Sequence, residues 1–90
     1  MSETFIPRER MSDILLEVAD RHGVTVDELT GPRRLRHIVR ARHEAMAETW
    51  RRTPLSKCEI GRRMGGRDHA TVIHGIRAHL AREGAKAMDQ

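Results

Sequence analysis

Ninety residues, of which 38% are hydrophobic and 33% charged, make one small domain that is too apolar for a disordered tail. The single cysteine excludes an internal disulfide and a multi-cysteine zinc site, and one phenylalanine and one tryptophan are too few for a protein that stacks single-stranded bases. No apolar run reaches the roughly 18–20 residues that span a bilayer, and no signal-peptide core follows Met1. We therefore expect a cytoplasmic, all-α domain that contacts no membrane.

Three helices are predicted in the N-terminal half. Apolar residues at spacings of three and four predict a first helix over 7–22, which Gly23 ends. Thr25 and Glu28 fit a capping box that opens a short helical turn, and Gly31 and Pro32 end it. A longer helix follows over about 35–50, with its buried side marked by Ile38, Ala41, Ala45 and Met46 and with Trp50 expected to anchor its end in the core.

Two further helices are predicted after Pro54. Ser56 and Glu59 form a second capping-box pattern for a short helix over about 57–64, and Gly65-Gly66 supplies a tight turn. The last helix begins near Asp68 as its N-cap and presents one apolar face, made of Val72, Ile73, Ile76 and Leu80. We expect an N-terminal arm over 1–9, the folded domain over 10–83 and a frayed tail over 84–90.

The charge is concentrated in the middle of the chain. Residues 1–32 carry a net −4, residues 33–67 a net +8 and residues 68–90 a net zero, which together give +4. Ten of the eleven basic residues in the middle segment are arginines, and the planar arginine fork suits phosphate and guanine better than a lysine does. A solvated basic face is the simpler explanation of such a run, but its size and confinement favour a polyanionic partner.

The order of short helix, glycine turn and longer helix predicts a helix-turn-helix, whose second helix enters the major groove of DNA. The first turn of that helix consists of Asp68, His69, Ala70 and Thr71, whose side chains are short or flat and mostly polar. An aspartate can accept from cytosine N4, a histidine can bond an acceptor, and a methyl group can meet a thymine methyl. An ordinary N-cap beside an exposed histidine would explain Asp68 and His69 alone, but the neighbouring basic residues favour base contact.

The run Gly65-Gly66-Arg67-Asp68-His69, within residues 56–74, resembles the signature of the DNA-binding domain of the bacterial replication initiator DnaA. The similarity extends back through the basic residues 33–42 and covers roughly residues 10–82. It implies that Arg34 enters the minor groove and that Asp68, His69, Ala70 and Thr71 contact or flank bases in the major groove. It also leads us to expect contacts with the DNA backbone at Arg33, Arg36, Arg42, Lys57, Cys58 and Arg67.

The sequence departs from that family at four positions. Ala70 stands where threonine is usual, Cys58 where proline is frequent, Lys57 where an apolar residue is frequent, and His43 where glutamine is common. The chain also has no phosphate-loop motif, so we expect no ATPase activity and no enzyme. The resulting hypothesis is a nucleoid-associated protein that binds double-stranded DNA at DnaA-box-like sites and regulates transcription or replication initiation, in possible competition with full-length DnaA.

No cofactor or metal is expected, because His69, His74 and His79 are five residues apart and cannot share one face of a helix. The alternative function is a protein-interaction module that docks a basic partner on the acidic N-terminal helix, with DNA binding vestigial. RNA is disfavoured as a ligand because its A-form major groove is too narrow for a helix. The resemblance suggests a monomer on an asymmetric site, while dimerisation through the N-terminal helix stays open.

Overall fold

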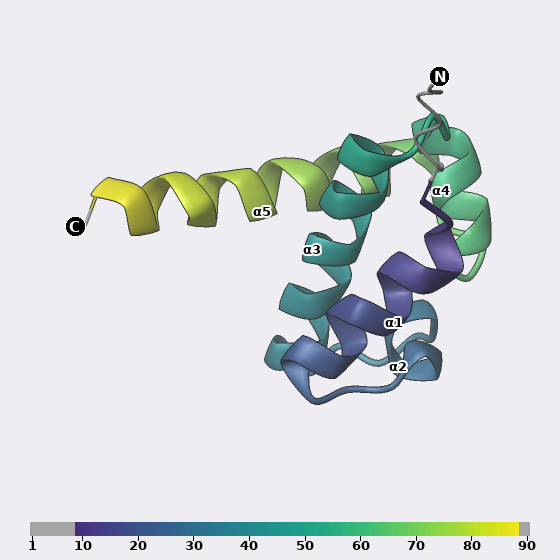
Figure 1. Cartoon of the computed structure of the whole chain (residues 1–90), viewed down its shortest axis with the longest axis horizontal. Coiled ribbons are helices and arrows are strands. Elements are labelled where there is room, and N and C mark those ends of the chain that lie inside the picture. The colour runs from purple at the N-terminus through teal and green to yellow at the C-terminus, as the bar shows by residue number, and fades with distance from the viewer. Residues whose placement is uncertain (1–8, 89–90) are drawn as a thin grey trace, which may run out of the picture.

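The computed structural model describes residues 9–88, with side chains up to residue 85, and every regular element in this range is an α-helix (Figure 1). The five helices are α1 (Met11–His22), α2 (Val26–Thr30), α3 (Arg36–Arg52), α4 (Lys57–Arg63) and α5 (His69–Met88). The all-α class predicted from the sequence is confirmed. Residues 7 and 8 of the predicted first helix lie outside the described residues, and Arg10 is already extended backbone. None of the described helices is long and apolar enough to cross a membrane.

The core forms around α3, against which the other four helices pack. Its fully buried side chains come from every helix and include Ile14, Val18, Leu29, Ile38, Met46, Ile60, Met64 and Val72. Burying a side chain of this size contributes roughly 1.5–3 kcal/mol to folding. The apolar spacing in the sequence therefore identified the inward faces of α1, α3 and α4 correctly.

The helix ends follow local side-chain chemistry. Thr25 and Glu28 form the predicted reciprocal capping box, and Gly23 ends α1 in the left-handed conformation with φ of 68°. The second predicted box forms only by half. Ser56 accepts from the Glu59 amide at 3.1 Å, but the Glu59 carboxylate pairs with Arg62 and Arg63 instead of reaching back.

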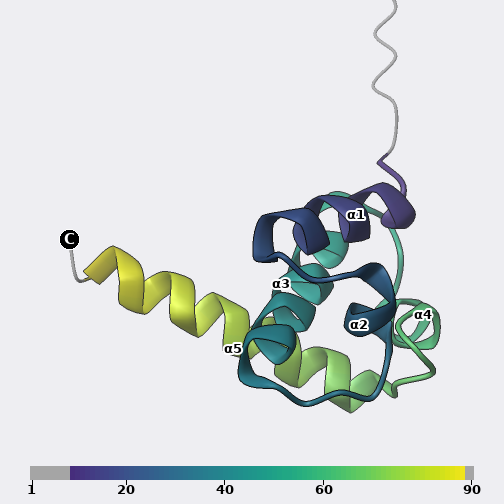
Figure 2. The ribbon, with the colours of Figure 1, turned by 90° about the horizontal axis from the view of Figure 1, so that it is seen from below.

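The end of α5 differs from the prediction. The helix continues past Gly84 to Met88, so a regular helix occupies most of the segment expected to be a frayed tail. Its C-terminal part extends beyond the other four helices (Figures 1 and 2). Leu80 of this helix, expected in the core, is 37% exposed. Neighbouring residues of α5 still contact α3, since the Arg82 Nη2 lies 3.0 Å from the His43 Nδ1 and the Arg51 Nη1 lies 3.3 Å from the Glu83 carboxylate. These contacts leave the side chain of Leu80 partly uncovered.

Trp50 also lies outside the core. Its side chain is 40% exposed, and the Lys57 ammonium lies 5.1 Å from the centre of the indole ring. A cation over an aromatic face is attracted by the ring's quadrupole. The tryptophan therefore links the end of α3 to the start of α4 at the surface, where a core anchor was expected.

Candidate nucleic-acid interface

The turn between α4 and α5 depends on three glycines. Gly65 and Gly66 have φ of 82° and 75°, which side chains other than glycine rarely adopt. Gly61 lies in α4 under the turn, and a Cβ added there would overlap the carbonyl oxygen of Arg67. The Arg67 amide also donates to the Gly61 carbonyl at 2.8 Å. These contacts hold the start of α5 close against α4, as a helix-turn-helix requires.

Asp68 caps α5, as predicted. Its Oδ1 accepts from the Thr71 amide at 2.9 Å, and this bond holds the pKa of the Asp68 carboxyl below its usual value. The next three side chains, His69, Ala70 and Thr71, are all exposed. The first turn of α5 therefore presents three uncovered side chains together with a carboxylate that stays ionised.

His69 contacts Cys58 from the start of α4. The Cys58 Sγ lies 3.6 Å from the Nδ1 of His69, and both residues are exposed. Because the two ring nitrogens lie on different edges of the imidazole, this contact leaves Nε2 available to a ligand. Cys58 thus orients a predicted base-contacting side chain, a role that its position in the sequence did not indicate.

Two arginines hold the loop between α2 and α3. Arg42 is only 5% exposed, and its guanidinium donates to the carbonyl oxygens of Leu29, Glu28, Gly31 and Arg33 at 2.7–3.0 Å. Arg67 is half-buried and donates to the carbonyl oxygens of Gly31, Thr30 and Met64. Both were expected at the DNA backbone. In this fold Arg42 donates to carbonyl oxygens of α2 and the loop, and Arg67 links the loop to the carbonyl oxygen of Met64, so both side chains help to hold the loop that carries Arg33 and Arg34.

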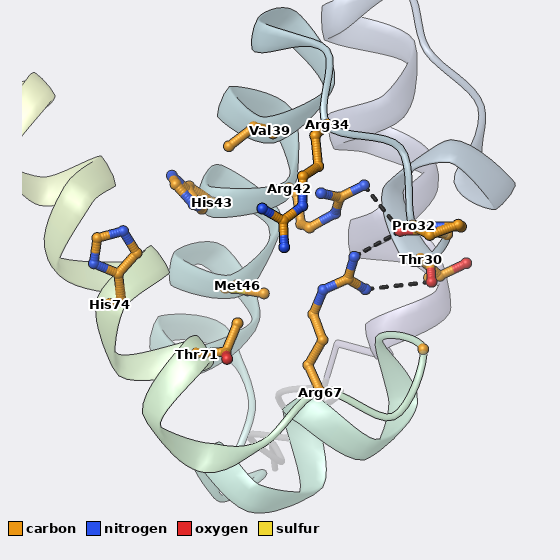
Figure 3. A pocket seen from close by; sticks show the side chains of 12 residues that line it. Thr30, Pro32, Arg34, Val39, Arg42, His43, Met46, Arg67, Thr71 and His74 are labelled. Atoms are coloured by element: carbon orange, nitrogen blue, oxygen red, sulfur yellow. Dashed lines mark hydrogen bonds between the residues drawn. The ribbon is translucent and has the colours of Figure 1, made fainter.

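A groove of about 760 Å³ lies between this loop, α3 and α5 (Figure 3). Arg34 points into it from the loop, His43 and Met46 line it from α3, and Thr71 and His74 line it from α5. Arg34 and the first turn of α5 therefore meet at one surface. This is the arrangement that simultaneous contact with two neighbouring DNA grooves requires.

His43 and His74 both line this groove, and their side chains contact each other. This contact was not predicted from the sequence. Their rings meet edge to face with 5.6 Å between centres, and the Arg82 Nη2 lies 3.0 Å from the Nδ1 of His43. Burial, helped by the charge of Arg82, lowers the pKa of His43 to about 4. A neutral His43 can accept from Arg82 at neutral pH. The sequence did hold one signal for the position of His74. It follows Thr71 by three residues, and residues three apart lie on the same face of a helix.

The remaining predicted residues lie around the groove or beside the turn. Arg33 is exposed and its Nη1 lies 3.4 Å from the Glu28 carboxylate, while Arg36 is exposed at the first position of α3. Lys57 is half-buried beside Trp50 at the start of α4. Arg33 and Arg36 therefore lie on the Arg34 side of the interface, whereas Lys57 and Cys58 belong to α4.

One group of possible metal ligands lies away from the groove. Glu48 of α3 and His79 and Glu83 of α5 offer ligand atoms within 4.8 Å of one another. Both carboxylates already pair with arginine: Arg52 Nη1 lies 3.2 Å from Glu48, and Arg51 Nη1 lies 3.3 Å from Glu83. A cation there would have to displace these guanidinium groups. We therefore assign the group to the packing of α5 against α3.

The chain is similar over most of its length to one family. A family model described as the bacterial dnaA protein helix-turn-helix matches residues 11–78. The chromosomal replication initiator protein DnaA of Cereibacter sphaeroides is 45% identical over 67 residues, which are 74% of this chain and 15% of that protein. DnaA of Rhizobium meliloti is 49% identical over 70 residues, which are 78% of this chain and 15% of that protein. The chain spans about 15% of the length of these relatives.

Proposed function

The chain belongs to the family of bacterial DnaA helix-turn-helix domains, which are DNA-binding modules, and we propose that it recognises double-stranded DNA at DnaA-box-like sites. The first turn of α5 enters the major groove, and Arg34 enters the adjoining minor groove. The observation that carries this proposal is that Arg34 and Thr71 line one groove although they come from different elements.

The exposed side chains at the start of α5 can contact bases in different ways. The Nε2 of His69 can bond a base edge, the methyl of Ala70 can pack on a thymine methyl, and the hydroxyl of Thr71 can donate or accept. The Asp68 carboxylate combines capping with an acceptor for cytosine N4. Arg34 suits the minor groove because a narrow minor groove concentrates negative potential.

Contacts with the DNA backbone come from basic side chains that are at least partly exposed. Arg33 and Arg36 flank Arg34, and Lys57 lies at the first position of α4, on the other side of the turn. Phosphate contacts fix the register of the protein on DNA and make its affinity depend on salt, but they carry no sequence information. We exclude Arg42 from this set because its donors are bonded to loop carbonyls.

In the cell, we propose that occupation of such a site regulates transcription or replication initiation without ATP hydrolysis by these residues. A relative that carries the same kind of domain is named a replication initiator. Two proteins with similar recognition helices compete for one box, so this chain would exclude a full-length initiator from it. We propose that the bound form is a monomer, because one helix-turn-helix and one Arg34 loop together cover an asymmetric site.

Internal ion pairs argue against the alternative of an acidic docking surface. Glu9 and Glu17 pair with Arg52 of α3, and Glu28 pairs with Arg33. These acidic groups of the N-terminal third are thus partly neutralised within the domain and are less available to a basic partner.

Fluorescence anisotropy of a labelled duplex at fixed salt tests the proposal. We expect the wild-type chain to prefer a duplex that carries a DnaA box over a scrambled duplex of equal length and composition. His69→Ala and Arg34→Ala should remove most of that preference, because each takes away contacts that distinguish bases or groove shape. Unchanged preference in both variants would contradict the assignment.

A further inference from the structure

A second pocket lies beside the Arg34 groove and is lined almost entirely by arginines. Its volume is about 390 Å³, and its lining consists of Arg34, Arg36, Val39, Arg40 and Arg82. Three of the arginines belong to the loop before α3 and to its first turns, and Arg82 reaches them from the C-terminal half of α5. Two elements far apart in the sequence therefore bring four guanidinium groups to one pocket.

These four arginines differ from most others in the domain. Arg21, Arg33, Arg51, Arg52, Arg62 and Arg63 each pair with a glutamate. Among the side chains that the structure describes, no carboxylate lies within ion-pair distance of the four arginines that line the pocket. Like charges in one pocket repel each other, so an anion bound there relieves a repulsion that the fold leaves uncompensated.

Arg82 is held in place by α3. Its Nη2 donates to the Nδ1 of His43 at 3.0 Å, and the T-shaped contact with His74 fixes the His43 ring in turn. Arg82 lies outside residues 11–78, which the family model matches, and it belongs to the C-terminal half of α5. The continuation of α5 thus brings to the interface a charge that the helix-turn-helix itself does not supply.

We propose that Arg36, Arg40 and Arg82, with Arg34 at the border, bind a phosphodiester of the DNA backbone beside the minor groove that Arg34 enters. This inference rests on the proposed function. The ligand is a phosphate because the planar guanidinium fork matches its oxygens and because the pocket offers only cations and one aliphatic side chain. It belongs to the bound duplex because Arg34 lines both the groove and the pocket.

Salt-dependent binding by the 90-residue chain provides the first test. Arg82→Gln should weaken binding to the box duplex about 3–10-fold at about 0.1 M salt and lower the slope of log K against log salt by up to about 0.9, the value for one phosphate. The ratio of box to scrambled binding should persist, since a phosphate carries no sequence. Arg77→Gln is the matched control, because Arg77 is an exposed arginine of the same helix that does not line the pocket.

A second test locates the phosphate. Single neutral methylphosphonates are placed in turn along both strands of the box duplex, and affinity is measured for the wild type, Arg82→Gln and Arg77→Gln. We expect one or two positions that weaken the wild type and Arg77→Gln but leave Arg82→Gln unaffected. Circular dichroism confirms that all three proteins are folded. The inference is overturned if no position loses its effect in Arg82→Gln, or if Arg77→Gln behaves in the same way.

Two further outcomes separate this inference from the proposed function. If the wild type prefers the box and His69→Ala does not, while Arg82→Gln matches Arg77→Gln, only the phosphate pocket is wrong. If the wild type shows neither box preference nor salt-dependent binding, the proposed function fails and the pocket assignment fails with it. Saturable binding of pyrophosphate to the free protein that Arg82→Gln abolishes, without any sensitive methylphosphonate position, would assign a free phosphate ligand and overturn the backbone assignment.

Discussion

Arg42 and Arg67 donate to the same acceptor, the carbonyl oxygen of Gly31, at 3.0 and 2.6 Å. Arg42 comes from the middle of α3, and Arg67 from the turn that precedes α5. The loop that carries Arg34 is therefore fastened at one point to both elements. A shift of the turn would move the loop with it, which couples the position of Arg34 to that of α5.

Arg42→Ala should lower the free energy of unfolding by about 2–4 kcal/mol. The substitution removes a largely buried group that donates to four backbone carbonyls, and its loss leaves these carbonyl oxygens desolvated and without that donor. Urea denaturation followed by Trp50 fluorescence measures the change. Arg77→Ala is the exposed control and should stay within about 0.5 kcal/mol of wild type. A similarly small effect of Arg42→Ala would mean that the loop does not depend on this guanidinium.

Gly65→Ala should destabilise the domain more than Gly66→Ala. Both residues have positive φ, which costs a residue with a side chain roughly 1–2 kcal/mol. A Cβ at Gly65 would in addition overlap the carbonyl oxygen of Thr30, whereas a Cβ at Gly66 meets open space. Gly66→Ala thus serves as the matched control for backbone strain alone. Equal midpoints for the two variants in thermal unfolding would show that α2 does not press against the turn.

The stability of the domain should fall between pH 7 and pH 5 because of His43. Burial lowers the pKa of His43 to about 4 in the folded state, while the unfolded chain keeps a value near 6.5. The unfolded state therefore binds more protons in this window, and the stabilising contribution that is complete above pH 6.5 declines as the pH falls towards 4.

Urea denaturation at pH 7 and pH 5 measures this loss. We expect the wild type to lose about 1–2 kcal/mol more than His43→Gln, a figure reduced from the full shift because solvent reaches part of the ring. Carboxylates that titrate at lower pH are common to both proteins and cancel in the comparison. Parallel pH dependence of the two proteins would show that His43 does not titrate in this way.

Ala70→Thr should change base preference without changing stability. Ala70 is exposed in the first turn of α5, where a threonine hydroxyl can bond a base edge while its methyl keeps the contact that alanine makes. Binding to a set of box duplexes with single base-pair changes should show a several-fold altered preference at one or two adjacent positions. An unchanged profile would place Ala70 away from the bases.

The helices and most of the core could be predicted from the sequence because their signals are local. Apolar spacing predicted the buried faces of α1 and α3, and Thr25, Ser56 and Asp68 all cap helices where expected. The predicted roles of Leu80 and Trp50 were wrong, since both are exposed. An apolar side chain is buried only if another element covers it, and a helical pattern does not say how far a helix extends past its neighbours.

The interface was less accessible to sequence reasoning. The exposure of His69, Ala70 and Thr71 follows from their place before the first buried residue of α5, so the pattern could indicate it. The sequence could not predict that Arg42 and Arg67 bond to backbone carbonyls while other arginines stay exposed. A guanidinium group can donate to carbonyl oxygens and to phosphates equally well. The four carbonyl oxygens that accept from Arg42 come together only in the folded chain, so the sequence could not reveal them.

Methylation interference tests most directly whether one surface contacts two DNA grooves. Dimethyl sulfate marks guanine N7 in the major groove and adenine N3 in the minor groove, and bound and free duplexes are compared for the wild type, Arg34→Ala and His69→Ala at low salt. We expect interference at both kinds of position with the wild type, selective loss of the adenine N3 signals with Arg34→Ala and selective loss of the guanine N7 signals with His69→Ala. Interference in a single groove with the wild type, or loss of the same signals in both variants, would contradict the account.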